Sequence, residues 1–186
     1  MCKTYSQTVT GEMADIFHLY GNEYIKKHPL PVHYLKVIHD KISGDAPSLN
    51  LEFEKRVHIA CLQAIDAGIV KSATDISDGG LAVAVSECCI KNTEKTLGAS
   101  VYIYRKMRDD ELFFGETQSV IVLTINEKDL LKLETIAGNN SVPCVTIGRV
   151  KEGGMLKLND SINISVDELK DAYLEALPKA MDGELL

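Results

Sequence analysis

The sequence lacks any apolar run approaching the roughly 20 residues that a membrane-spanning helix needs. Its N-terminal stretch, MCKTYSQTVTGEMAD, also lacks the apolar core of a secretory signal peptide. We therefore expect a cytoplasmic protein with no membrane partner.

Positive charge is scarce as well. The 186 residues include 20 Lys and Arg against 27 Asp and Glu, so the net charge at pH 7 is −7. Because a phosphate backbone binds basic surfaces, this balance argues against a nucleic-acid partner.

Cysteine and histidine patterns typical of metal sites are absent. There is no Cys-x-x-Cys pair, and the adjacent Cys88 and Cys89 would point about 100° apart on a helix, which does not suit one tetrahedral metal. None of the five histidines stands in an H-E-x-x-H frame. We expect reduced thiols and predict no metal site, with contact of Asp75 or Asp78 to a metal left open.

What is present is a core-forming composition, with 45% hydrophobic residues, and an ordered series of helical and strand-like segments. Long helices come first, and strands then mix with helices and tight turns. This order predicts an α+β fold, a layered α/β domain with a mostly antiparallel sheet flanked by helices. The expected helices are 32–42, 51–67, 81–92, 109–114, 126–139 and 165–179, and the expected strands are 99–104, 119–125, 142–150, 155–158 and 162–165.

Local signals mark several helix ends. Asn50 is suited to cap the helix that follows it, and Gly68 is suited to end that helix. Asn126 is expected to cap another helix, and Ser165 opens a capping-box pattern. By contrast, residues 1–30 show no clean periodicity, so we expect 1–30 to be a linker or arm from a missing upstream domain and 31–186 to be the domain.

The polar stretch TDISDGG directly precedes an apolar helical run. It compresses Asp75, Ser77, Asp78, Gly79 and Gly80 into one short loop. Glycines at a helix N-terminus let a phosphate or carboxylate approach unpaired backbone N–H groups. The two acids repel an anion, but they suit helix capping, sugar hydroxyls, an amine or a metal ion. The alternative is an ordinary helix start that binds nothing.

A second polar cluster, FFGETQS, lies at the mouth of an expected buried strand. Gly115, Glu116, Gln118 and Ser119 follow a pair of phenylalanines there. Buried polar side chains need partners or a ligand, although an ordinary loop with local hydrogen bonds remains the alternative.

Together these stretches resemble a known family. SATDISDGGLAVAVSE, LFFGETQS, IGRV and DELKDAYLEALPKAM are similar to the C-terminal domain of phosphoribosylformylglycinamidine synthase, synthetase subunit, of the aminoimidazole ribonucleotide synthetase superfamily. GNEY, YLKVIH and SGDAPSLNLE resemble the linker and first helix of that domain, so the likeness runs from about Gly21 to Met181. The resemblance implies a partly ferredoxin-like domain that closes a cleft over a phosphoribosyl substrate.

The resemblance also implies chemistry and partners. The family amidates formylglycinamide ribonucleotide in purine biosynthesis, using ATP and ammonia from glutamine, with ATP and magnesium held mainly by an N-terminal half. It implies a glutamine amidotransferase subunit or domain and a small accessory subunit as partners. The residues that match family motifs, and are therefore expected to bind substrate or phosphate, are Asp75, Ser77, Asp78, Gly79, Gly80, Gly115, Glu116, Gln118 and Ser119.

Three departures from the family pattern stand out. Thr74 replaces a frequent histidine, and Val120 replaces the arginine of G-E-S-Q-S-R, which puts phosphate binding at that position in doubt. No glycine-rich ATP-binding half is present, and Met1 falls where a linker should be. We therefore expect a fragment of a longer synthetase that is inactive alone.

Other functions remain open on the sequence. One is a related superfamily enzyme: selenophosphate synthetase, thiamine-monophosphate kinase or the hydrogenase-maturation dehydratase. Another is a stand-alone regulatory module that binds a phosphate or nucleotide, and a third is a purely structural domain.

Overall fold

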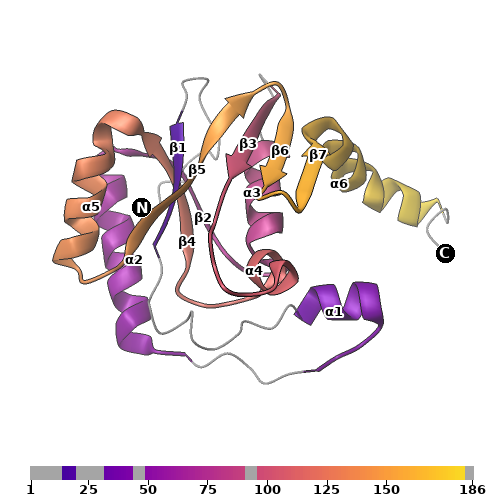
Figure 1. The fold of residues 1–186 in the computed structure, drawn as a ribbon, viewed down its shortest axis with the longest axis horizontal. Helices are drawn as coiled ribbons and strands as arrows, with labels where there is room; N and C mark the ends of the chain where they lie inside the picture. Colours follow the sequence, from indigo (N-terminus) through magenta and orange to yellow (C-terminus); the bar gives the residue numbers. More distant parts are fainter. Residues whose placement is uncertain (1–13, 20–31, 44–48, 91–95, 183–186) are drawn as a thin grey trace.

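A computed structural model describes residues 14–19, 32–43, 49–90 and 96–182, and its centre is one seven-stranded sheet (Figure 1). The strand order is β2-β4-β1-β5-β3-β6-β7, and every neighbouring pair is antiparallel except β3 and β6. The strands are β1 (Ala14–Leu19), β2 (Val70–Asp75), β3 (Leu97–Val101), β4 (Ile121–Asn126), β5 (Cys144–Glu152), β6 (Met155–Leu158) and β7 (Ile162–Ser165). The mixed α/β, mostly antiparallel fold predicted from the sequence is confirmed.

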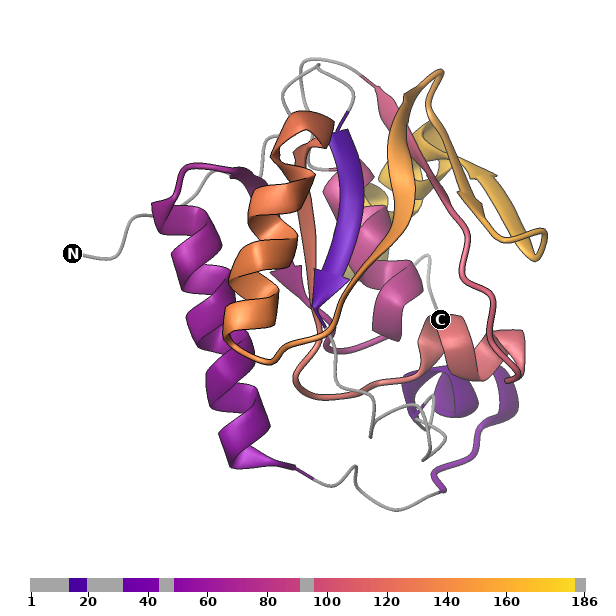
Figure 2. The ribbon, with the colours of Figure 1, turned by 60° about the vertical axis from the view of Figure 1, so that its left-hand side comes forward.

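Helices pack on both faces of this sheet (Figures 1 and 2). The helices are α1 (Val32–His39), α2 (Leu51–Asp66), α3 (Gly80–Ile90), α4 (Asp109–Phe114), α5 (Leu130–Asn139) and α6 (Val166–Met181), with a 3-10 turn at Glu127–Asp129. α2 and α5 cover one face, whereas α3, α4 and the start of α6 pack on the other. In the described part of the chain, no helix is long and apolar enough to cross a bilayer.

The two layers exist because β4 is apolar on both sides. Successive strand residues point to opposite faces, so Val122 packs with the α3 side while Leu123 and Ile125 pack with the α2 side. All three are at most 3% exposed, which makes β4 a buried strand with a neighbour on each edge, as its run of apolar residues predicts.

The helix-end signals can now be compared with the structure. The Asn50 side chain accepts from the backbone N–H of Phe53 at 3.0 Å, and Gly68 follows α2 with a φ of +70°. Ser165 Oγ accepts from the N–H of Glu168 at 3.1 Å. Asn126 is a correction, since its side chain makes no cap hydrogen bond and α5 starts only after the 3-10 turn.

Two strands were not predicted from the sequence. β2 is short and polar, with alternation too weak to identify it, and β1 lies inside the segment 1–30 that was expected to be an arm. β1 pairs with both β4 and β5, so these six residues belong to the sheet. The rest of 1–30 lies outside the described residues, and its assignment as an arm stays a prediction. The strand expected over 99–104 ends at Val101.

Burial controls the chemistry of the cysteines. Cys61 and Cys144 both pack with the core on the α2 side, and burial raises the pKa of both thiols. The pKa of Cys144 rises to about 12, and that of Cys89 rises to about 12 through burial and the neighbouring Cys88.

We predict that Cys89 and Cys144 resist alkylation in the folded chain. A pKa near 12, against an ordinary thiol value of 9.0, reduces the thiolate fraction at pH 8 about a thousandfold. Iodoacetamide labelling read by mass spectrometry should show these two sites protected in buffer and modified in urea. Equal labelling rates in both conditions would contradict the burial.

Candidate functional site

The two polar clusters lie side by side because the strands beside them pair. In the antiparallel β2–β4 ladder, Asp75 is the partner of Ile121. The N–H of Ile76 then donates to the carbonyl of Val120 at 3.0 Å. The chain leaving β2 and the chain entering β4 therefore lie at the same end of the sheet.

A glycine turn follows β2 and starts α3. The N–H of Gly80 donates to the carbonyl of Ser77 at 3.1 Å, and Gly79 and Gly80 have φ values of +80° and +72°. Only glycine adopts such angles at little cost. A Cβ on Gly80 would also lie 2.7 Å from the backbone carbonyl carbon of Phe114, so this glycine lets α3 approach the end of α4.

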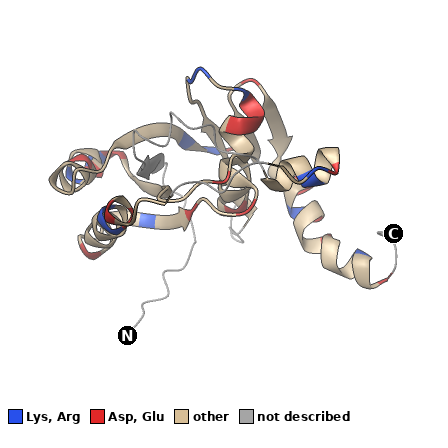
Figure 3. Cartoon of the chain, turned by 90° about the horizontal axis from the view of Figure 1, so that it is seen from below, with Lys and Arg blue, Asp and Glu red and all other residues tan. Residues whose placement is uncertain are grey.

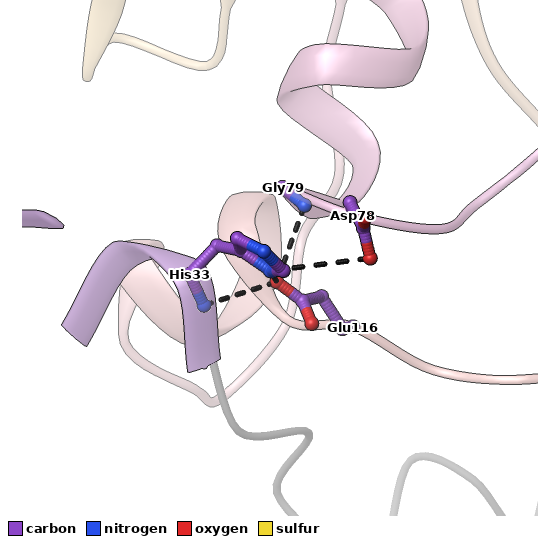
Figure 4. A network of polar contacts seen from close by, with 4 residues as sticks. All are labelled: His33, Asp78, Gly79 and Glu116. Atoms are coloured by element: carbon purple, nitrogen blue, oxygen red, sulfur yellow. Dashed lines mark hydrogen bonds and ion pairs between the residues drawn. The ribbon is translucent and has the colours of Figure 1, made fainter. Parts of the chain in front are cut away.

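The carboxylate of Glu116 joins this turn to α1 (Figure 4). Its Oε1 accepts from the N–H of Gly79 at 3.2 Å and from the N–H of His33 at 3.1 Å. The same oxygen lies 2.7 Å from His33 Nδ1, and Asp78 Oδ1 lies 4.0 Å from that nitrogen. Residues 33, 78 and 116 therefore converge from three separate segments.

Ring stacking holds α1 in this position. The rings of Tyr34 and Phe114 stack with centroids 5.0 Å apart and an interplanar angle of 24°. The sequence offered no signal for His33, because its segment showed only helical periodicity and its partner lies 83 residues away.

This contact changes the expected role of the glycine loop. The sequence predicted backbone N–H groups open to a phosphate, but the N–H of Gly79 already donates to a carboxylate of the chain itself. An anion at that N–H would have to displace Glu116. Asp75, Ser77 and Asp78 are exposed, with the Asp78 side chain 87% exposed even though it lies 4.0 Å from His33 Nδ1, so a ligand can reach all three.

The GETQS segment divides into residues with different surroundings. Gly115 is buried at the end of α4, and Gln118 is exposed. Ser119 is buried at a φ of +61°, and its hydroxyl donates to Glu54 Oε2 on α2. Glu54 Oε1 in turn lies 2.8 Å from His58 Nε2. Ser119 therefore ties the loop to α2, whereas Glu116 faces the glycine turn.

A buried threonine hydroxyl lies in the same loop, and charged residues of both signs lie intermixed on the described helices. The Thr117 Oγ1 atom is buried and has no hydrogen-bond partner among the described residues. Seen from below, Lys and Arg lie dispersed among Asp and Glu on several helices (Figure 3).

Comparison with known proteins gives a consistent result. Residues 33–161 match the family model described as AIR synthase related protein, C-terminal domain. The chain is 34% identical to the phosphoribosylformylglycinamidine synthase subunit PurL of Symbiobacterium thermophilum over 81% of its length, and 35% identical to that of Methanocaldococcus jannaschii over 82%. It spans only 21% of either relative.

Solved structures show the same fold at lower identity. Thermotoga maritima PurL complexed with FGAR matches with a TM-score of 0.69 and 18% identity, over 89% of this chain and 29% of that one. PurLQS from the same organism matches with a TM-score of 0.62 and 18% identity, over 84% and 26%.

We predict that Gly80→Ala destabilises the chain more than Gly68→Ala does. Both glycines have nearly the same φ, but among the described residues a Cβ at Gly68 meets nothing within 4 Å. Gly68→Ala should cost about 1 kcal/mol in free energy of unfolding for its left-handed backbone, and Gly80→Ala about 2–4 kcal/mol because overpacking adds to that strain. Urea unfolding followed by circular dichroism measures both, and equal losses would refute the close approach.

We also predict that Glu116→Ala exposes the amides it accepts from. Hydrogen exchange at the N–H groups of Gly79 and His33 should accelerate about tenfold, which corresponds to about 1.4 kcal/mol of local stability. Glu116→Gln, which keeps an acceptor oxygen, should show a smaller change, and Glu52→Gln on exposed α2 surface should show none. Unchanged exchange rates in Glu116→Ala would mean that these hydrogen bonds do not contribute to the local stability of the two amides.

Proposed function

The chain belongs to the family of AIR synthase related proteins and corresponds to their C-terminal domain, and from this premise we propose that it is the cleft-forming domain of a phosphoribosylformylglycinamidine synthase. The observation that carries the proposal is the juxtaposition of the two family-like loops, joined by the hydrogen bond from Gly79 to Glu116. The two relatives described above, which match more than four fifths of this chain, bear the name of that enzyme.

The proposed reaction is the ATP-dependent amidation of formylglycinamide ribonucleotide. The amide oxygen attacks the γ-phosphorus of ATP, ADP leaves, and ammonia from glutamine then displaces inorganic phosphate to form the amidine. In this scheme the exposed carboxylates of Asp75 and Asp78 accept from the sugar hydroxyls of the substrate, and the exposed Ser77 hydroxyl donates to its phosphate. Gly79, Gly80, Gly115, Glu116, Gln118 and Ser119 shape the wall of the cleft.

We assign ATP to another part of the synthetase. The N–H of Gly79 is occupied by Glu116, and in the described residues the turn offers no second unpaired glycine N–H, because that of Gly80 donates to Ser77. This geometry does not fit a triphosphate cradle, which needs several free backbone donors. Magnesium would accompany ATP on the other domain.

The partners follow from the length of the relatives. Since the chain spans about a fifth of them, we propose that the remaining synthetase domains, a glutamine amidotransferase and a small accessory subunit complete the enzyme. The match to PurLQS supports this assembly. The isolated chain would then be inactive, and the enzyme would work in the cytoplasm.

A chimera tests the proposal. This chain replaces the matching segment of the Methanocaldococcus jannaschii relative, and amidine formation from ammonia, ATP and formylglycinamide ribonucleotide is measured. We expect the chimera to be active and the isolated chain to be inactive. Ser77→Ala together with Asp78→Asn should lower kcat/KM of the chimera at least tenfold, while Glu127→Gln, at the opposite end of β4 from the loops, should leave it within twofold.

Two results would contradict the proposal. A folded chimera without activity would reject the cleft role, as would unchanged kcat/KM in the double variant. Tight binding of a phosphorylated metabolite by the isolated chain, together with an inactive chimera, would instead favour a stand-alone regulatory module.

A further inference from the structure

We propose that His33, Asp78 and Glu116 form a binding site for a divalent transition-metal ion. One ligand atom from each residue lies within 4.8 Å of the others, although the three residues come from separate segments of the chain. The set combines one imidazole nitrogen with two carboxylates (Figure 4). The sequence left contact of Asp78 with a metal open, but it gave no indication of His33 or Glu116, because no two of these residues have metal-ligand spacing.

The distances suit a metal after small movements. Metal bonds of about 2.1 Å place two ligand atoms about 3.0–4.2 Å apart for bond angles between 90° and 180°. The distance from His33 Nδ1 to Glu116 Oε1 is 2.7 Å, and that to Asp78 Oδ1 is 4.0 Å. The Asp78 side chain is 87% exposed, so there is room for its carboxylate to turn toward the other two ligands.

Two of the three ligands are already held in place. The backbone N–H groups of Gly79 and His33 fix the Glu116 carboxylate, whose side chain is only 19% exposed. The stack of Tyr34 on Phe114 fixes the start of α1, which carries His33. Such hydrogen-bonded support orients ligands and strengthens metal binding. The ion would bind to both Nδ1 and Oε1 once these atoms move from 2.7 Å to at least about 3.0 Å apart, and it would keep positions open to solvent.

Charge and ligand chemistry select the kind of ion. Two carboxylates neutralise a divalent cation, and among the described residues neither forms an ion pair with a lysine or arginine. Oxygen ligands alone would suit Mg²⁺, but an imidazole ligand favours ions toward the zinc end of the divalent series. The site should therefore prefer Zn²⁺ or Co²⁺ to Mg²⁺.

This inference stands apart from the proposed function, although Asp78 and Glu116 belong to both. Metal binding is measured on the 186-residue chain without substrate, ATP or other domains. It can therefore fail while the chimera is active, and it can succeed while the chimera is inactive.

Calorimetric titration with Zn²⁺ tests the site. The wild-type chain is freed of metal by a chelator and compared with His33→Ala, Asp78→Asn and the control His58→Ala. The control removes the other described pair of a histidine and a carboxylate, His58 with Glu54. We expect His33→Ala to weaken Zn²⁺ binding at least tenfold, Asp78→Asn to weaken it several-fold, and His58→Ala to leave it within twofold.

A second measurement uses only the wild-type chain, so its result does not depend on whether the variants fold. In the wild-type chain, Co²⁺ should shift or broaden the imidazole NMR signals of His33 before those of His39 and His58, whereas Mg²⁺ at the same concentration should leave them unchanged. The proposal is overturned if His33→Ala binds Zn²⁺ as tightly as the wild type does, or if His58→Ala weakens binding as much as His33→Ala does. It is also overturned if Co²⁺ does not affect the His33 signals before those of His39 and His58.

Discussion

One carboxylate oxygen, Oε1 of Glu116, connects the parts of this molecule that carry its family-like motifs. This oxygen accepts hydrogen bonds from the glycine turn before α3 and from the first turn of α1. Glu116 itself lies two residues after the end of α4. Without it, the N–H of Gly79 and that of His33 would each lose a charged acceptor. The loss is larger for the part-buried bond from Gly79, because water can replace the acceptor of the exposed bond from His33. A polar loop that looks open to an outside anion in the sequence is thus satisfied from within the chain.

That contact depends in turn on a non-local pairing. β2 and β4 are separated by the whole of α3, β3 and α4, and only their antiparallel ladder brings Ile76 against Val120. The ladder is stable because β4 is apolar on both faces and anchors two separate helical layers. Ser119 adds a second tie through Glu54, so the GETQS loop is fixed at one end to α2 and at the other to α1 and α3.

The sequence predicted those features whose cause is local. Asn50, Gly68 and Ser165 act on their own helix ends, and they behave as expected. β1 and β2 could not be identified, because a short strand is defined by partners far along the chain. The dense polar motifs pointed to the right two loops. They could not show that Ser119 turns toward α2 or that His33 joins the cluster, since both depend on tertiary packing.

The structure also separates residues that a motif presents as equals. Gly80 is buried against the backbone of Phe114, and any side chain there disturbs the contact of α3 with α4. Its substitution reports on folding first, so loss of activity in such a variant says little about ligand contact. Ser77 and Asp78 are exposed beside the same turn, and the Asp78 side chain only approaches His33 at 4.0 Å. Ligand contact is therefore tested at these exposed positions, where activity can change while the fold does not.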